Sequence, residues 1–552
     1  MRTAYGVETV RAAERELMAR LPEGALMQSA AAGLAVVCAD VLGRVSGRVY
    51  GSRVVLLVGS GDNGGDALYA GARLARRGAG VRAVLLAPGR AHSGGLAALL
   101  RAGGRVVDAG GGIGAVEQAD LVVDGIVGIG GKGGLRPDAV PLAEAAERGR
   151  GVVVAVDLPS GVDADTGEVR GRALRADLTV TFGAYKPGLL IDPAREYAGA
   201  VRLVDIGLAV GEGGQGEARG EMPGEARGEA RGEARVEARG EARGEARVET
   251  RVETPGEAPG EARVEALQHA DVARLLPVPA AESDKYRRGV VGVAAGSARY
   301  PGAAVLAVAG ALRGGAGAVR YVGPAGEAVI ARHPETLVSD RGPKHAGRVQ
   351  AWVVGPGAGD DAATVGEVLA ADVPVLIDAD GLRLAEVGAV RGRRAPTLMT
   401  PHAGEAAALL GVEREEVEAG RLAAVRELAG RYGATVLLKG STTLVASAGD
   451  GDAGENAGGV AGGVAGGGVG QGAGVVRVNP TGTPWLATAG SGDVLSGLGG
   501  SLLAAGLSAV DAGSVAAYLH GLAGRFAAEG APVTAEDVAG RIAEAWRSVV
   551  RG

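Results

Sequence analysis

The residues best suited to chemistry near the C-terminus form a short glycine-rich turn that ends in an aspartate. Gly490, Ser491 and Gly492 come just before Asp493, and a helical run follows from Val494 to Ala505. Successive backbone N–H groups in such a turn can point at an anion, and the helix dipole adds to the attraction. A carboxylate at this place can act as a base toward a hydroxyl. In the alternative interpretation, Asp493 only caps the helix.

A second glycine-rich run follows an expected strand in the first half of the chain. Gly59, Gly61 and Gly64 match the pattern G-x-G-x-x-G and precede a helical run from Ala67 to Arg77. Glycines there let the backbone approach a phosphate at a helix N-terminus, although a tight turn gives the same pattern. The next expected strand ends at Leu86 with no acidic residue to hold an adenosine ribose. This argues against an ordinary NAD dehydrogenase.

Two aspartates end neighbouring expected strands in the same half. Asp124 is followed by the loop Gly128–Gly134, and Asp157 by the run Pro159–Asp163. Each aspartate could simply cap a turn. Three loops that converge on one sheet edge nevertheless favour a binding site over three unrelated turns.

Short runs rich in Val and Leu alternate with helical patterns, and these elements must position the loops. The expected strands are residues 53–58, 81–86, 121–124 and 152–157 in the first half, and 290–294, 352–354, 375–378 and 435–439 in the second. Continuous apolar strands separated by helices imply largely parallel sheets that helices cover on both faces, which is the α/β class. In such sheets, ligands bind beyond the carboxyl ends of the strands, where these motifs stand.

Two low-complexity stretches divide the chain. Glu recurs every four residues from Glu217 to Glu265 without an apolar stripe, so we expect a disordered Glu/Arg/Gly tether over residues 211–266. A glycine-rich stretch at 449–474 lies between two strand-like runs and is expected to be a flexible insert. Two domains remain, at residues 1–210 and 267–552.

Composition excludes several classes of protein. The net charge of −6 argues against general nucleic-acid binding, which needs a basic face. Cys38 is the only cysteine, so an internal disulfide framework and a multi-cysteine metal site are excluded. The first 18 residues lack the apolar region of a signal peptide, and the charge-free run between Asp493 and Asp511 is too short to span a membrane. We therefore expect a cytoplasmic protein with neither nucleic-acid nor membrane partners; a homo-oligomer is compatible with the sequence.

The first domain resembles the NAD(P)H-hydrate epimerase domain, which implies a Rossmann-like fold. Three runs carry the resemblance: the glycine-rich run ending at Asp66, Val-Asp-Gly-Ile-Val-Gly around Asp124, and Asp157-Leu-Pro-Ser-Gly-Val-Asp163. The family usually shows Asn-Asn-Gly-Gly-Asp-Gly in the first run, where this chain has Asp62 and Ala67 at the two ends. By motif, the hydrated nucleotide would contact Asp62, Asn63, Gly64, Gly65, Asp66, Gly128, Ile129, Gly130, Gly131, Lys132, Gly133, Gly134 and the catalytic Asp157. Asn63, Asp124 and Ser160 would hold a potassium ion, and oxygen ligands of this kind suit a hard cation.

The second domain resembles the nucleotide-dependent NAD(P)H-hydrate dehydratase, which has a ribokinase-like fold. The run around Asp493 is joined by Tyr300–Ala304, Val354–Gly359, Met399–Glu405 and Lys439–Thr443. By motif, the hydrate would face Ala303, Gly359, His402 and Asp493, with Asp493 as the catalytic base. ADP or ATP, accompanied by Mg²⁺, would bind Lys439, Gly440, Ser441, Thr442, Thr443 and Gly492. A lone histidine is more often structural, and His402 gains its role only from the neighbouring Pro401 and Glu405.

Together the two resemblances imply a bifunctional enzyme that repairs hydrated NADH and NADPH. The first domain would interconvert the R and S hydrates, and the second would dehydrate the S form; resemblance to bacterial members suggests ADP as the co-substrate. One alternative is a ribokinase-like kinase for a vitamin or sugar, and another is a first domain that binds a nucleotide without catalysis. The sequence lacks G-x-S-x-G, the P-loop pattern and any histidine pair with zinc spacing.

Overall fold

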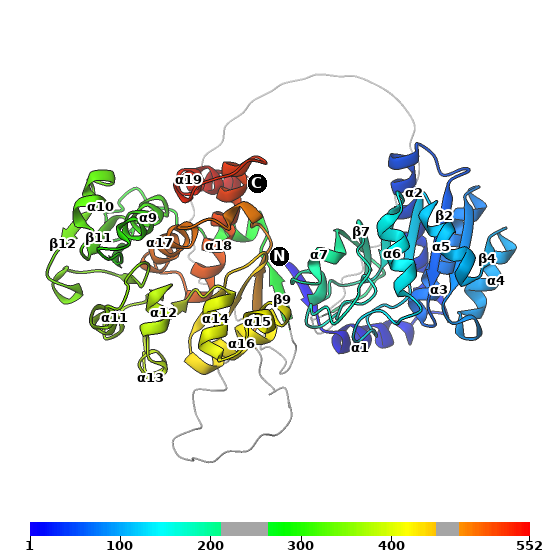
Figure 1. Ribbon diagram of the computed structural model, residues 1–552, viewed down its shortest axis with the longest axis horizontal. Coiled ribbons are helices and arrows are strands. Elements are labelled where there is room, and N and C mark those ends of the chain that lie inside the picture. The colour runs from blue at the N-terminus through cyan, green and yellow to red at the C-terminus, as the bar shows by residue number, and fades with distance from the viewer. Residues whose placement is uncertain (211–262, 449–473, 552) are drawn as a thin grey trace, which may run out of the picture. The chain divides into compact units, whose positions relative to one another are not determined.

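The computed structural model describes residues 1–210, 263–448 and 474–551 (Figure 1). The expected tether and the expected glycine-rich insert lie almost wholly outside these described residues. The C-terminal end of the tether, placed at residue 266 from the sequence, is an exception, because Arg263–Ala266 form the strand β9.

The first domain is built on a seven-stranded sheet in which all neighbouring strands are parallel. The strands, in their order across the sheet, are β4 (Arg105–Val107), β3 (Gly80–Leu85), β2 (Arg53–Val58), β5 (Leu121–Gly125), β6 (Val152–Val156), β7 (Leu178–Phe182) and β8 (Ala200–Val204). Alternate residues of β2 enter two different hydrophobic clusters, with Val54 and Leu56 on one face and Val55 and Leu57 on the other. The unbroken apolar runs therefore mark strands that are buried on both faces.

Helices cover both faces of this sheet. On one face lie α2 (Ala25–Ser46), α3 (Asp62–Arg76) and α4 (Ser93–Arg101), and on the other α5 (Ala109–Glu117) and α6 (Val140–Arg148). The helices α1 (Val7–Met18) and α7 (Arg195–Ala198) and the 3-10 turns η1 (Pro88–Arg90) and η2 (Pro187–Leu189) complete the domain. The expected three-layer α/β/α arrangement is confirmed.

Among the described residues, α2 is the one helix long and apolar enough to cross a membrane. Its buried side chains, including Leu34, Cys38 and Leu42, pack into the same cluster as Leu56 of the sheet. It also carries Asp40, which pairs with Arg44 and Arg202. These contacts are typical of a core helix in a globular domain.

The second domain contains an eleven-stranded sheet. Its strands, in order, are β1 (Arg2–Tyr5), β9 (Arg263–Ala266), β18 (Val476–Asn479), β17 (Thr443–Ala446), β16 (Thr435–Leu438), β15 (Thr397–Met399), β14 (Val375–Ile377), β13 (Ala351–Val354), β10 (Val290–Ala294), β11 (Ala318–Val322) and β12 (Leu337–Ser339). The block from β16 to β12 is parallel, whereas β17 pairs antiparallel with both of its neighbours and β1 pairs antiparallel with β9.

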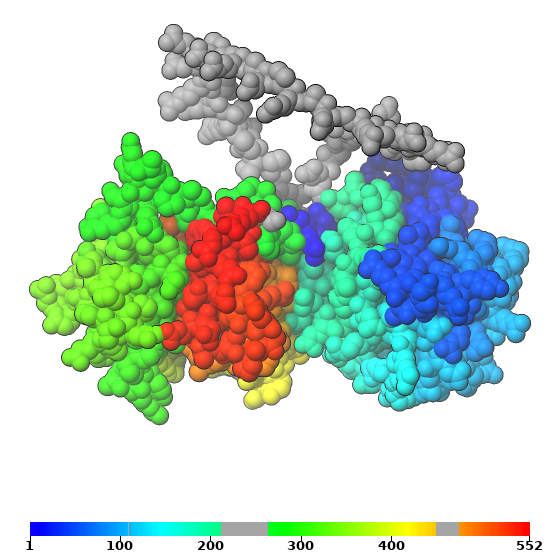
Figure 2. Space-filling view, turned by 90° about the horizontal axis from the view of Figure 1, so that it is seen from above, coloured from blue at the N-terminus to red at the C-terminus, as the bar shows by residue number. Residues whose placement is uncertain are grey.

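Two helical layers cover this sheet. One contains α8 (His269–Leu275), α9 (Pro301–Arg313), α10 (Gly326–Arg332), α17 (Ser491–Ala504), α18 (Ala509–Ala528) and α19 (Ala535–Arg551). The other contains α11 (Ala362–Leu369), α12 (Asp380–Leu384), α13 (Val387–Arg391), α14 (Ala403–Leu410), α15 (Arg414–Ala419) and α16 (Arg421–Tyr432). The turns η3 (Pro343–His345) and η4 (Pro484–Leu486) complete the domain. Helix α19 buries Val538 and Ile542 and leaves its other side on the surface, coloured red in Figure 2.

The expected strands agree with the observed ones to within about one residue at each end. The helix starts were expected too late. Helix α3 begins at Asp62 rather than Ala67, and α17 begins at Ser491 rather than Val494. Glycine-rich residues that read as a loop therefore form the first helical turn in both cases, which places the motif residues themselves at the helix N-terminus.

Candidate active sites

The first candidate site is formed where the loops after β2 and β5 touch. A Cβ atom on Gly59 would lie 1.8 Å from the carbonyl oxygen of Ile126, and one on Gly64 would lie 2.5 Å from the carbonyl oxygen of Gly59. Only glycine permits these approaches. The glycine-rich pattern thus has a packing reason: it allows the start of α3 to meet the neighbouring loop.

Asn63 lies at the centre of this contact. Its Oδ1 atom would be 3.0 Å from a Cβ atom on Gly128, and its buried Nδ2 atom has no hydrogen-bond partner among the described residues. Ala67, which departs from the family pattern, is fully buried beside Gly125, where a second Cβ would come within 2.7 Å. The extra methyl group of Ala67 is therefore accommodated by a glycine and does not enter the loop region.

Asp124 and Ser160 form a buried pair. The Ser160 hydroxyl donates to Oδ1 of Asp124 at 2.7 Å, and the Ser160 backbone N–H donates to Oδ2 at 2.8 Å. Both residues are fully buried. Burial raises the pKa of Asp124 to about 6, although hydrogen bonds from Ser160 and Ile126 oppose the change. In the described part of the chain, the Asp124 carboxylate is stabilised by hydrogen bonds and by no cationic side chain. A bound cation would therefore offset the cost of burying its charge.

Asp157 follows β6 with a backbone φ of +65°, a left-handed conformation that is uncommon outside glycine. Its Oδ1 atom accepts hydrogen bonds from Lys186 Nζ at 2.5 Å and from Thr181 Oγ1 at 2.9 Å. Lys186 is only 1% exposed. Lys186 was not expected from the sequence, although its run Lys186-Pro-Gly follows β7 in the same strand-then-loop pattern as the other site residues.

Two further carboxyl groups, those of Asp66 and Glu14, interact electrostatically with Asp157, and Asp62 interacts with both of them. Burial raises the pKa of Asp66 well above its usual value, and Asp157, Asp62 and Glu14 raise it further. Burial also raises the pKa of Glu14, which belongs to α1 and was not anticipated from the sequence. Asp62 is exposed at the start of α3. The structure therefore brings the expected residues Asp62, Asp66 and Asp157 into one charged cluster.

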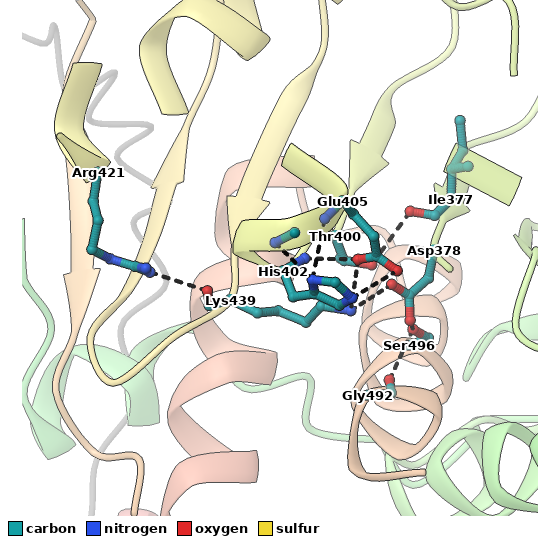
Figure 3. A network of polar contacts seen from close by, with 10 residues as sticks. Ile377, Asp378, Thr400, His402, Glu405, Arg421, Lys439, Gly492 and Ser496 are labelled. Atoms are coloured by element: carbon teal, nitrogen blue, oxygen red, sulfur yellow. Dashed lines mark hydrogen bonds and ion pairs between the residues drawn. The ribbon is translucent and has the colours of Figure 1, made fainter. Parts of the chain in front are cut away.

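The second candidate site contains a buried polar network, which Figure 3 shows. Lys439 extends from the end of β16, and its Nζ atom lies 2.7 Å from Asp378 Oδ1 and 3.7 Å from Glu405 Oε2. The Ser496 hydroxyl of α17 donates to the other Asp378 oxygen at 2.6 Å. Burial lowers the pKa of Lys439, but Asp378 and Glu405 outweigh it and raise the pKa overall. Lys439 is therefore a cation held in one place.

Asp493 occupies the third position of α17 and does not cap it, because the helix has no side-chain cap. Its carboxylate makes no hydrogen bond within the described residues. The pKa of Asp493 is raised to about 7, mainly by burial and next by Asp378, while Lys439 opposes the change. Gly490 precedes the helix in a left-handed conformation, and a Cβ atom on Gly492 would lie 3.4 Å from Lys439 Nζ. The expected base, the glycine turn and the expected nucleotide-binding lysine thus meet at one helix N-terminus.

His402 is the N-cap of α14. Its Nδ1 atom accepts from the backbone N–H groups of Gly404 and Glu405, and Glu405 in turn accepts from the His402 N–H at 2.7 Å. The Nδ1 atom of His402 therefore has a structural role, because it caps the helix. The side chain is 57% exposed, and Nε2 lies 3.5 Å from Glu405, so Nε2 is the ring atom that could meet a ligand.

The remaining expected contacts differ in their surroundings. A Cβ atom on Gly359 would meet nothing within 4 Å, whereas one on Gly357 would press on Ala303. Ala304 is fully buried, while Ala303 is half-buried. Open space thus lies beside Gly359 rather than Gly357, and Ala303 is the more accessible alanine.

The run Gly440–Thr443 turns back from β16 into β17 around a buried arginine that the sequence analysis missed. Arg421 donates to the carbonyl oxygens of Leu438, Lys439 and Thr442. The hydroxyl of Ser441 donates to Asp192, and that of Thr442 accepts from the Asp192 N–H. These two side chains are therefore already engaged, whereas Gly440 is exposed.

Two family models match the chain. The model described as YjeF-related protein N-terminus matches residues 23–188, and the model described as NAD(P)H-hydrate dehydratase matches residues 291–472 and 469–544. Among solved structures, an ADP/ATP-dependent NAD(P)H-hydrate dehydratase from Bacillus subtilis, co-crystallized with ATP/Mg²⁺, is 26% identical and has a TM-score of 0.43, covering 51% of this chain and 97% of its own.

Full-length relatives match almost the whole chain. The bifunctional NAD(P)H-hydrate repair enzyme Nnr of Mycobacterium tuberculosis is 43% identical over 93% of this chain and 91% of its own. That of Mycobacterium leprae is 42% identical over 96% of this chain and 94% of its own. The chain therefore belongs to the family of bifunctional NAD(P)H-hydrate repair enzymes.

Proposed function

We propose that this chain restores hydrated NADH and NADPH, with its first domain interconverting the R and S hydrates and its second dehydrating the S hydrate at the expense of ADP or ATP. The observation that carries the proposal is the placement of Asp493 beside Gly492 and Lys439, because it joins a base, an anion-binding turn and a fixed cation. ADP is the co-substrate we expect from the likeness to bacterial relatives.

In the second domain, Asp493 accepts the proton of the hydrate hydroxyl at carbon six. The hydroxyl oxygen then attacks the terminal phosphoryl group of the nucleotide, and the shorter nucleotide leaves. Backbone N–H groups of Gly490 and Gly492 stabilise the charge on the transferred phosphoryl group, and they need no reorganisation because the start of the helix fixes them. Phosphate is then eliminated together with a ring proton, which restores the reduced nicotinamide. Mg²⁺ bound with the nucleotide would neutralise phosphate charge.

Asp493 is suited to this role by its pKa. A base works best when its pKa is near the working pH, and burial together with Asp378 brings the pKa of Asp493 to about 7. Ala303, Gly359 and Nε2 of His402 would border the hydrate, since each is half-buried or exposed.

In the first domain, Asp157 would act on the same hydroxyl of the hydrate and exchange it between the two faces of the ring. Asn63, Asp124 and Ser160 would hold a potassium ion, because the buried Asp124 carboxylate has no cation partner among the described residues and the side chains of Asn63 and Ser160 can add oxygen ligands. The ion would supply a positive charge close to the bound nucleotide. The backbone of Gly128–Gly134 and the N-terminus of α3 would bind the rest of the substrate.

The direct assay supplies hydrated NADH with ADP and Mg²⁺ and follows the return of the reduced-nicotinamide absorbance. ATP replaces ADP in a parallel reaction, and separated R and S hydrates replace the mixture in a third. The absence of any return with both nucleotides would refute the dehydratase proposal. Unchanged ratios of separated epimers without nucleotide would refute the epimerase proposal.

A further inference from the structure

Lys186 is the most deeply buried cation of the first domain's candidate site, and the family motifs assign it no role. We propose that Lys186 is a positioning residue for epimerisation, which holds Asp157 through Oδ1 so that Oδ2 meets the hydrate hydroxyl. The inference rests on the epimerase activity proposed for this domain.

Lys186 belongs to a set of hydrogen-bond donors that converge on one oxygen of the Asp157 carboxylate. Its Nζ atom donates to Asp157 Oδ1 at 2.5 Å, to Thr181 Oγ1 at 3.0 Å and to the carbonyl oxygen of Phe182 at 3.2 Å. The three donor hydrogens of the ammonium group are therefore used. Thr181 and the N–H of Phe182 also donate to Oδ1. Within the described residues Oδ2 makes no hydrogen bond, so the carboxylate is fixed by one oxygen and free at the other.

The backbone of Asp157 needs such support. Its left-handed φ of +65° is unfavourable for a residue with a side chain, and its N–H is held by the carbonyl oxygen of Val180 at 2.7 Å. The side chain of Asp157 is 11% exposed and that of Lys186 is 1% exposed. Burying either charge without the other would be costly, so the pair is stable only as a unit.

The surrounding charges make the ammonium group more important. Glu14 of α1 and Asp62 and Asp66 of α3 all act on the same cluster as Asp157. Without Lys186, Oδ1 of Asp157 would lose its closest hydrogen-bond donor, and the carboxylate would no longer be held in one orientation. Removing the lysine should therefore impair turnover much more than substrate binding.

The test is a double-mutant cycle on epimerisation, measured without ADP or ATP so that the S hydrate is not consumed. Lys186→Met should lower kcat by about 10- to 100-fold, as loss of an outer-shell partner of a catalytic group does, and leave KM unchanged. Lys186→Arg keeps the positive charge and should retain more activity than the methionine variant. In an Asp157→Asn background, Lys186→Met should cause no further loss of kcat, because the lysine acts through the carboxylate.

Thr179→Val is the matched control. It removes a buried hydroxyl from the same strand, which donates to the Ala198 carbonyl oxygen and does not touch Asp157; its kcat should equal that of the wild type. Wild-type kcat in Lys186→Met, or the same fold-loss in both backgrounds, would overturn the inference. If Lys186→Met does not fold, Lys186→Gln is compared with Lys186→Arg, and equal kcat values in these two would overturn it as well. A wild-type enzyme that does not interconvert the epimers refutes the proposed function itself, which separates the two failures.

Discussion

Replacing Asp493 by asparagine should abolish dehydration and at the same time stabilise the second domain. The native carboxylate has a pKa of about 7 against an ordinary value of 3.8, with burial as the main cause. Asparagine has nearly the same shape but cannot ionise. The variant therefore removes both the base and the cost of holding a charge in a buried place.

The magnitude follows from linkage between protonation and folding. Because the pKa is raised in the native state, the folded domain binds more protons than the unfolded chain, and its stability falls as the pH rises from about 4 to about 7. At pH 8 the ionised Asp493 costs about 4 kcal/mol, from 1.36 kcal/mol for each pKa unit. For a domain of this size that corresponds to an increase in Tm of roughly 10 °C for Asp493→Asn at pH 8. At pH 5 the difference should fall to less than about half.

Tryptophan fluorescence can measure the Tm of the second domain, because the three tryptophans of the chain, Trp352, Trp485 and Trp546, all belong to that domain. Fluorescence-detected melting thus reports this domain selectively. Asp360→Asn is the control, since the Asp360 side chain is 93% exposed and the change should leave Tm unaltered at both pH values. Refutation would be a variant no more stable than the wild type at pH 8, or a difference that does not shrink at pH 5. Retained dehydration in Asp493→Asn would refute its role as the base.

The remaining predictions concern both sites. The kcat/KM for dehydration should increase about tenfold with each unit of rising pH up to about pH 7 and stay constant above it, because only the ionised Asp493 can accept a proton. A flat kcat/KM profile between pH 5 and pH 7 contradicts this. Asp157→Ala should stop interconversion of separated epimers and leave dehydration of the S hydrate intact, so loss of both activities or of neither counts against the assigned site. Epimerase activity should be higher in KCl than in choline chloride of equal ionic strength, and Asp124→Asn should remove the difference; an equal response in variant and wild type speaks against the potassium site. Lys439→Met should raise the KM for ADP at least about tenfold, as loss of a buried charged contact to phosphate does, and an unchanged KM would show that the lysine does not meet the nucleotide.

The parts of each site that lie within a single loop could be predicted from the local sequence. The Gly490–Asp493 and Asp62–Asp66 runs, the two strand-end aspartates and the limits of eight strands could be predicted, because glycine turns and apolar strands leave signatures within a few residues. The helix starts were placed late because glycines at 64, 65 and 492 lower helix propensity, while tertiary packing overrides this preference.

Partners that come from distant elements could not be predicted. Lys186 lies 29 residues from Asp157, and Asp378 lies 61 residues from Lys439. Glu14, which interacts with Asp157, belongs to helix α1, and this helix contains none of the motifs found in the sequence. Such pairs depend on the order of strands across the sheet, which a single sequence does not specify. Asp378 nevertheless ends an expected strand as Asp124 and Asp157 do, so the same reasoning could have proposed it.

The pairing of β1 with β9 affects how this chain can be divided for expression. Residues 2–5 fall within the range expected for the first domain, 1–210, yet they supply the outermost strand of the second domain's sheet. A fragment that begins at the second domain would expose the backbone N–H and C=O groups of β9 along a free edge, and such edges promote aggregation. Isolated halves should therefore be less soluble than the intact polypeptide, and an affinity tag is better attached at the C-terminus than beside Arg2.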